Sequence, residues 1–194
     1  MTHTAIFYAE RNHYYSLLSP ARLVLNLGCG SGSFLRYWPY VSSAFIVNID
    51  NGYEEHAGWP AWGIENKGWE GFKKLSSSFG NVKNIDGDVR NLNIFPSNLF
   101  DLIVAGEILE HISLSDADVA LEEWIRVLVP SGIIQIDTPN FDALKEMKDY
   151  VTDHVHEYKE DELRKLMKAH KGIENKFKIL HNGFGFWGEW RFFK

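Results

Sequence analysis

The chain has 194 residues, of which 45% are hydrophobic and 24% are charged, so we expect one globular domain and exclude a disordered, collagenous or mucin-like chain. Its 20 basic and 26 acidic residues give a net charge of −6, which disfavours a nucleic acid as the main partner. The single cysteine, Cys29, allows no internal disulfide, and no apolar run has the ~20 residues of a membrane helix or forms a signal-peptide core. We therefore expect a cytoplasmic protein with no membrane partner, either a monomer or a homodimer.

Short apolar segments alternate with helical stretches along the chain. Strands are predicted at residues 22–27, 44–49, 82–86, 100–105 and 132–137. Because near-continuous apolar runs suit strands that are buried on both faces, these segments indicate a parallel sheet. Residues 116–129 place apolar side chains on one face of a helix, with Ser115 or Asp116 as its N-cap. Residues 159–167 predict a charged surface helix.

The end of the chain has a different pattern. Residues 177–181 and 187–193 flank a glycine-containing turn, which predicts an antiparallel hairpin. The predicted fold class is therefore α/β, with a doubly wound, mostly parallel seven-stranded sheet and a C-terminal antiparallel hairpin. We expect the whole chain to form a single domain, with an N-terminal helical segment at 1–20 and an insertion rich in Trp and Gly at 51–80.

A glycine-rich loop follows the first predicted strand. Residues 28–33 read GCGSGS, and glycines let a backbone turn sharply and approach a ligand without an intervening Cβ atom. The second strand ends at Asp50, whose carboxylate can accept hydrogen bonds from both hydroxyls of a ribose. A nicotinamide-binding loop requires glycine or alanine where this chain has Ser33, so the G-x-G-x-G pattern favours a different nucleoside cofactor.

Residues 24–32 resemble motif I of the class I S-adenosylmethionine-dependent methyltransferases. Further segments resemble later motifs of that family, at residues 86–89, 100–107 and 126–132. The resemblance covers roughly residues 20–193 and implies the Rossmann-like methyltransferase fold, with S-adenosylmethionine as cofactor. It departs from the family at Asn26, where an acid is common, and at Ser131, which replaces a glycine. The cofactor-binding residues that it implies are Gly28, Gly30, Gly32, Asp50, Asp88, Val89 and Glu107.

The fourth strand is followed by the segment E-x-x-E-H. If a helix opens at Glu107, then Glu107, Glu110 and His111 lie on one face of it. His156, which follows the fifth strand, can complete a set of ligands for a divalent metal such as Mg²⁺. The segment resembles the metal site of small-RNA 2′-O-methyltransferases, and equally bacterial O-methyltransferases of small molecules. Three alternatives stay open: this metal site, a lone histidine base (His111 or His156), or neither.

The resemblance implies an S-adenosylmethionine-dependent methyltransferase that methylates a hydroxyl of a small molecule or sugar. One alternative is metal-assisted 2′-O-methylation of an RNA end, which the net charge of −6 disfavours. Another is a cofactor-binding module without catalysis, which the retained acid–histidine set disfavours. The residues expected to be catalytic are His111 and His156.

Overall fold

The computed structural model describes residues 11–30, 32–51, 76–144, 154–170, 173–179 and 185–192. Of the predicted N-terminal segment at 1–20, residues 11–17 are helical, and residues 1–10 lie outside the described part. Most of the predicted insertion at 51–80 also lies outside it, since residues 52–75 are not described.

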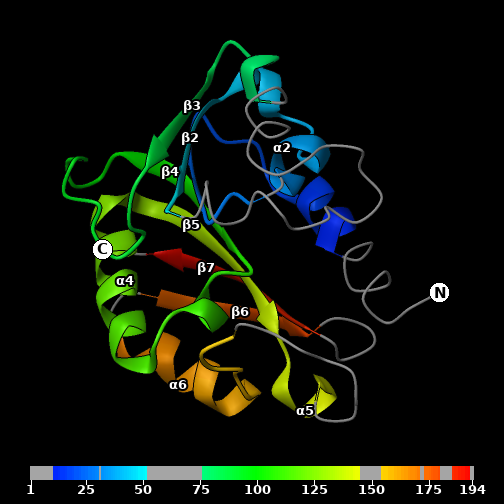
Figure 1. Cartoon of the computed structure of the whole chain (residues 1–194), viewed down its shortest axis with the longest axis vertical. Helices are drawn as coiled ribbons and strands as arrows, with labels where there is room; N and C mark the ends of the chain where they lie inside the picture. Colours follow the sequence, from blue (N-terminus) through cyan, green and yellow to red (C-terminus); the bar gives the residue numbers. More distant parts are fainter. Residues whose placement is uncertain are drawn as a thin grey trace.

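A single sheet organises the described chain, in the order β3-β2-β1-β4-β5-β7-β6 (Figure 1). Its strands are β1 (Leu23–Leu27), β2 (Phe45–Asp50), β3 (Val82–Asp86), β4 (Phe100–Gly106), β5 (Leu128–Pro139), β6 (Ile173–Ile179) and β7 (Gly185–Phe192). β1 to β5 pair in parallel, whereas β7 pairs antiparallel with both β5 and β6. The predicted class, a mostly parallel, doubly wound α/β fold, is confirmed.

The helices are α2 (Ser33–Tyr37), α4 (Leu114–Val127), α5 (Phe141–Leu144) and α6 (Glu160–Ala169), with short 3₁₀ helices η1 (Val41–Ser43) and η3 (Leu109–His111). The predicted surface helix at 159–167 corresponds to α6. The predicted cap of α4 was wrong, because Ser113 is the N-cap and its Oγ accepts a hydrogen bond from the Asp116 N–H. None of the helices among the described residues is long and apolar enough to cross a bilayer.

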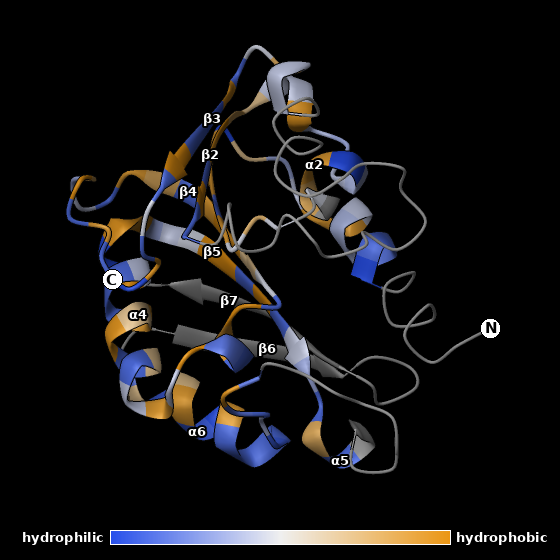
Figure 2. Ribbon diagram, in the orientation of Figure 1, coloured by the Kyte–Doolittle hydropathy of each residue, from blue (hydrophilic) through white to orange (hydrophobic). Residues whose placement is uncertain are grey.

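Two apolar clusters cover the two faces of the sheet. One contains Trp124 of α4 and Leu163 of α6, and the other contains Phe34 and Trp38 around α2 together with Tyr15. Apolar residues accordingly follow the strands and the inward faces of α4 and α6, while the outer faces of these helices are polar (Figure 2). This double burial keeps the sheet rigid and fixes the positions of the loops at the carboxyl ends of its strands.

Candidate cofactor and acid–histidine site

The glycine loop continues directly from β1. Gly28, Gly30 and Gly32 have φ angles of +59°, +42° and +80°, in the left-handed region that favours glycine. A Cβ atom on Gly28 would lie 2.8 Å from Cδ1 of Ile108, so a side chain there would collide with the residue that faces the loop. The loop is therefore shaped by backbone alone at the point where it faces Ile108.

Asp50 lies against this loop at the end of β2. Its side chain is buried, and its Oδ2 accepts a hydrogen bond of 3.0 Å from the Gly30 N–H. The Gly28 N–H donates to the carbonyl oxygen of Ile49 at 2.9 Å, which ties the beginning of the loop to the same strand. The carboxylate and the glycine turn are thus held in one arrangement.

A cavity of about 170 Å³ opens beside them. It is lined by Gly28, Asp50, Asn51, Asp88, Val89, Arg90, Ile108, His111, Ile112, Ser113 and Asp116. Four of the residues predicted to bind the cofactor therefore share one wall. Gly30 lies next to that wall through its bond to Asp50, whereas Glu107 does not line this cavity.

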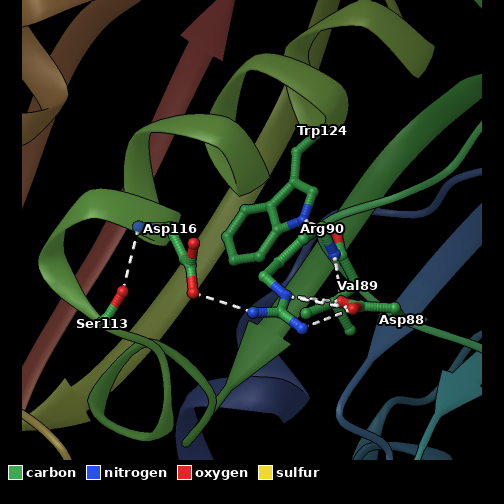
Figure 3. A network of polar contacts seen from close by, with 6 residues as sticks. All are labelled: Asp88, Val89, Arg90, Ser113, Asp116 and Trp124. Atoms are coloured by element: carbon green, nitrogen blue, oxygen red, sulfur yellow. Dashed lines mark hydrogen bonds and ion pairs between the residues drawn. The ribbon is translucent and has the colours of Figure 1, made fainter.

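Arg90 occupies the rim of the cavity between two acids (Figure 3). Its Nη2 lies 2.6 Å from Oδ2 of Asp88, and its Nη1 lies 2.8 Å from Oδ2 of Asp116. The hydrogen bonds from Arg90 lower the pKa of Asp88, so this carboxylate is ionised at neutral pH. Arg90 was not predicted as a site residue, and Asp116 was predicted only as a possible N-cap; the signal for Arg90 was an arginine two residues after an expected ligand-binding acid.

A group of buried acids lies at the ends of β4 and β5. Oδ2 of Asp137 accepts hydrogen bonds from the Tyr15 hydroxyl at 3.2 Å and from Nε2 of Gln135 at 3.0 Å. Oε2 of Glu110 accepts a hydrogen bond of 2.8 Å from the Thr138 hydroxyl. The sequence analysis also missed Asp137, because it lies within an apolar strand that otherwise indicates only core.

Burial raises the pKa of each of these acids. It raises the pKa of Glu110 to about 8 and that of Asp137 to about 6, and the Arg11 guanidinium opposes both shifts. Burial also raises the pKa of Glu107, and the neighbouring charges of Glu110 and Asp137 raise it further. The cluster therefore carries less negative charge at neutral pH than its three carboxyl groups suggest.

Glu107 does not open an α-helix, so the condition for a shared helical face of Glu107, Glu110 and His111 is not met. Its φ angle is +55°, a left-handed conformation, and the 3₁₀ helix η3 begins only at Leu109. The Glu107 N–H donates instead to the carbonyl oxygen of Asp137 at 2.9 Å, which holds the chain against β5. Glu107, Glu110 and His111 consequently do not form one helical face.

The histidines divide between two places. In the described part of the chain, the metal-ligating atoms of Glu110, His111 and His154 lie within 4.8 Å of one another, and the two imidazole rings meet edge to face at 5.0 Å. His156 is not in this group: its Nε2 lies 3.6 Å from Oε2 of Glu162, and its ring contacts Tyr158. The N–H groups of Val155 and His156 both donate to the Glu110 carbonyl oxygen.

The fold and the site together define a class of protein. A glycine turn after β1, a carboxylate at the end of β2 and a cavity between them, in a sheet of this order, are those of a class I S-adenosylmethionine-dependent methyltransferase. The model of the family described as "Methyltransferase domain" matches residues 25–136, and the chain belongs to that family. It is a methyltransferase that uses S-adenosylmethionine.

Solved structures share the fold at low sequence identity. The PH0226 protein from Pyrococcus horikoshii OT3 is 19% identical with a TM-score of 0.71, and the match covers 97% of this chain and 90% of that one. The N-methyltransferase NodS from Bradyrhizobium japonicum WM9 is 17% identical with a TM-score of 0.68, covering 97% and 98%. The 1,6-didemethyltoxoflavin-N1-methyltransferase from Burkholderia thailandensis, solved with bound 1,6-didemethyltoxoflavin and S-adenosylhomocysteine, is 17% identical with a TM-score of 0.66, covering 98% and 76%. No curated protein matches the chain in sequence.

Proposed function

We propose that this enzyme transfers the methyl group of S-adenosylmethionine to a hydroxyl group of a small molecule or sugar, with His111 as the general base. The observation that carries the proposal is the position of His111, which lines the cavity together with Gly28 and Asp50. Bound S-adenosylmethionine supplies a methyl group on a sulfonium centre that is already activated. The protein then has to orient the acceptor and remove one proton from it.

The residues of the cavity fit the nucleoside part of this cofactor. Asp50 can accept hydrogen bonds from the ribose hydroxyls, and Gly28 lines the same cavity without a side chain. Asp88 and Val89 also line this cavity, and we assign them to the adenine of the cofactor. Gly30 and Gly32 shape the turn, and we assign Glu107 to the methionine side because it follows β4 beside the loop residue Ile108.

His111 has a neighbour that can support a change of protonation. Its ring lies against His154, whose Nδ1 is 3.2 Å from Oε1 of Glu157. A carboxylate at that position stabilises positive charge on the imidazole pair when a proton arrives from the acceptor. His156 remains a proposed second base, although its Nε2 lies near Glu162.

Transfer of a labelled methyl group tests the assignment. The protein is incubated with S-adenosyl-[methyl-³H]methionine and, separately, with pools of phenols, sugars and primary amines. We expect label on hydroxyl compounds, and a loss of about 100-fold or more in kcat for His111→Ala with unchanged S-adenosylhomocysteine binding. His170→Ala is the control, because His170 lies beside Asp118 on α4 and does not line the cavity. Label that appears only on amines would exclude the hydroxyl acceptor.

A second candidate is metal-assisted methylation of a hydroxyl. One observation favours it: within the described residues, Oε1 of Glu110 is fully buried without a hydrogen-bond partner, beside His111 and His154. A divalent ion held by these three side chains would lower the pKa of a bound hydroxyl. Glu157 would orient His154 from behind, as carboxylates commonly do for metal-binding imidazoles. Glu107 and His156, which the sequence analysis included in the set, do not belong to this group.

Titration with Mg²⁺, Mn²⁺ and Co²⁺ separates the two candidates. If a metal acts, we expect calorimetric binding of Mn²⁺ that Glu110→Gln and His154→Ala each weaken at least tenfold, with activity lost in chelator. His156→Ala serves as the matched histidine control for metal binding. Activity that is untouched by chelator, together with no Mn²⁺ binding, would leave His111 as a base without a metal.

A further inference from the structure

We propose that Arg90 is a positioning residue that sets the base preference of the cofactor pocket, by moving between Asp88 and Asp116 and thereby releasing Asp88 to the exocyclic amine of adenine. The inference rests on the proposed function, in which Asp88 lies at the adenine side of the cavity. It assigns a role to two residues, Arg90 and Asp116, that a nucleoside site of this kind does not need by itself.

Both oxygens of the Asp88 carboxylate already accept hydrogen bonds from Arg90. Oδ1 of Asp88 accepts hydrogen bonds from the Arg90 backbone N–H at 2.8 Å and from its Nε at 2.9 Å. Oδ2 accepts from Nε at 3.0 Å and from Nη2 at 2.6 Å. Three N–H groups of Arg90 make these contacts, because the Nε–H is shared between the two oxygens. An adenine amine that approaches Asp88 therefore competes with the guanidinium for the same two oxygens.

Asp116 is a second carboxylate that binds the Arg90 guanidinium. Nη1 of Arg90 already donates to Oδ2 of Asp116 at 2.8 Å, so the side chain can leave one carboxylate while it stays bound to the other (Figure 3). Arg90 is 42% exposed, and the space into which it would move is therefore not closed by packing. The second acid lowers the cost of the exchange, because the charge of the arginine is never left unpaired.

The supports on either side of Arg90 are fixed (Figure 3). On one side, the indole N–H of buried Trp124 donates to the Val89 carbonyl oxygen at 2.8 Å. On the other side, Asp116 lies in the first turn of α4, where its N–H donates to Oγ of Ser113 at 3.2 Å. With both backbones held, the guanidinium is the part of the network that can move.

The exchange has a chemical consequence for the base that binds. A 6-amino purine donates a hydrogen bond and so matches the released Asp88 carboxylate, whereas a 6-oxo purine accepts one and matches the Arg90 guanidinium. While Arg90 is bound to Asp88, the pocket accepts a 6-oxo purine. When a 6-amino purine binds, Arg90 releases Asp88 and keeps its hydrogen bond to Asp116. Both residues act on selectivity through Asp88.

The test compares S-adenosylhomocysteine with S-inosylhomocysteine, which differ at purine position 6 and in the hydrogen that the inosyl ligand carries on N1, by calorimetry on the whole chain. For Arg90→Ala, we expect the preference for the adenosyl ligand to rise at least threefold, because the inosyl ligand loses its donor while Asp88 is released. For Asp116→Asn, we expect adenosyl binding to weaken at least threefold and inosyl binding to change by less than twofold, because Arg90 then stays on Asp88.

Arg164→Ala is the matched control, since Arg164 pairs with Glu160 on α6, which does not line the cavity, and it should leave both affinities unchanged. Thermal unfolding of each variant checks that it is folded. An unchanged ratio in Arg90→Ala, or equal losses for both ligands in Asp116→Asn, would show that the network is only a structural wall. If the unmodified protein binds S-adenosylhomocysteine but the ratios do not move, this inference alone fails. If that protein does not bind S-adenosylhomocysteine, the proposed function fails as well.

Discussion

The Glu110 side chain is an ionisable group in a buried position. The residue is 0% exposed and its carboxyl group accepts a hydrogen bond from the Thr138 hydroxyl, yet it lies beside the imidazoles of His111 and His154. Burial raises its pKa from 4.5 to about 8. The group is therefore neutral in the folded protein over a range of pH in which it is ionised in the unfolded chain.

We predict that Glu110→Gln stabilises the protein above neutral pH. The folded state retains a proton that the unfolded state releases between pH 4.5 and about 8, so the stability contributed by this proton is complete below that window and is lost as the pH rises through it. Glutamine mimics the protonated form. Urea unfolding at pH 5 and pH 9 should show little difference at pH 5 and a gain on the order of 3 kcal/mol at pH 9. Glu160→Gln on exposed α6 controls for the loss of one acid, and an equal gain in that variant would contradict the argument.

Ser131 is held in a conformation that glycine adopts more easily. Its φ angle is +68°, and the next residue, Gly132, has no room for a Cβ atom, which would lie 2.7 Å from Cγ of Leu128. Ser131→Gly should therefore stabilise the protein by about 0.5 kcal/mol, because the relief of left-handed strain exceeds the added entropy of the unfolded chain. Gly132→Ala should destabilise it. Thermal unfolding measures both variants, and the same sign for the two would refute this view of the turn.

The sequence predicts site residues whose position follows from the order of the strands. It does not predict site residues that are brought together by tertiary contacts. Gly28 and Asp50 follow consecutive strands, so the sequence alone places them at one edge of the sheet. Arg90 meets Asp116 only because α4 begins beside the loop after β3. His154 rather than His156 faces His111, because the backbone between them turns on the Glu110 carbonyl oxygen. No periodicity in the sequence encodes that turn.

At the scale of elements, α4 fastens the loop between β3 and β4. Arg126 near its C-terminus donates to two backbone carbonyl oxygens of that loop, Leu92 through Nη2 and Phe95 through Nη1, both at 2.9 Å. Glu123 completes the clamp: its carboxylate accepts from Arg126 and also from the Leu92 N–H at 2.9 Å. The arginine that the sequence analysis noted only as part of a family motif thus has a structural role in this chain.

Arg126→Lys should lower the free energy of unfolding by about 1–2 kcal/mol, because an ammonium group cannot serve two carbonyl oxygens and a carboxylate in a planar fork. The same substitution at Arg164, whose described ion pair is with Glu160 on the surface of α6, should cost much less. Urea unfolding of the two variants at one pH gives the comparison. Equal losses would mean that charge alone, and not the fork geometry, holds the loop.

At the scale of the molecule, β5 joins two kinds of pairing. On one side it pairs in parallel with β4 and so belongs to the part of the sheet that carries the glycine loop. On its other side it pairs antiparallel with β7, which in turn pairs with β6, the last strand of the described sheet. We infer that these strands belong to the same folding unit as the site, because Asp137 of the acid cluster pairs with Trp187 of β7.

A proline scan tests this arrangement. Every N–H of β7 faces either β5 or β6, so proline at Glu189 or at its neighbour Trp190 removes a hydrogen bond of the sheet. Both proline variants should therefore lose the cooperative unfolding transition of the unmodified protein. In β6, successive N–H groups alternate between β7 and the side on which the described residues supply no further strand. Of the register partners Lys176 and Asn175, one should therefore tolerate proline with a loss below about 1 kcal/mol and the other should not. Alanine at the same four positions controls for the lost side chains, and circular dichroism during heating gives the readout. Proline tolerated at both β7 positions would show that β7 is not an interior strand, and the acid cluster would then lose the support of its neighbour.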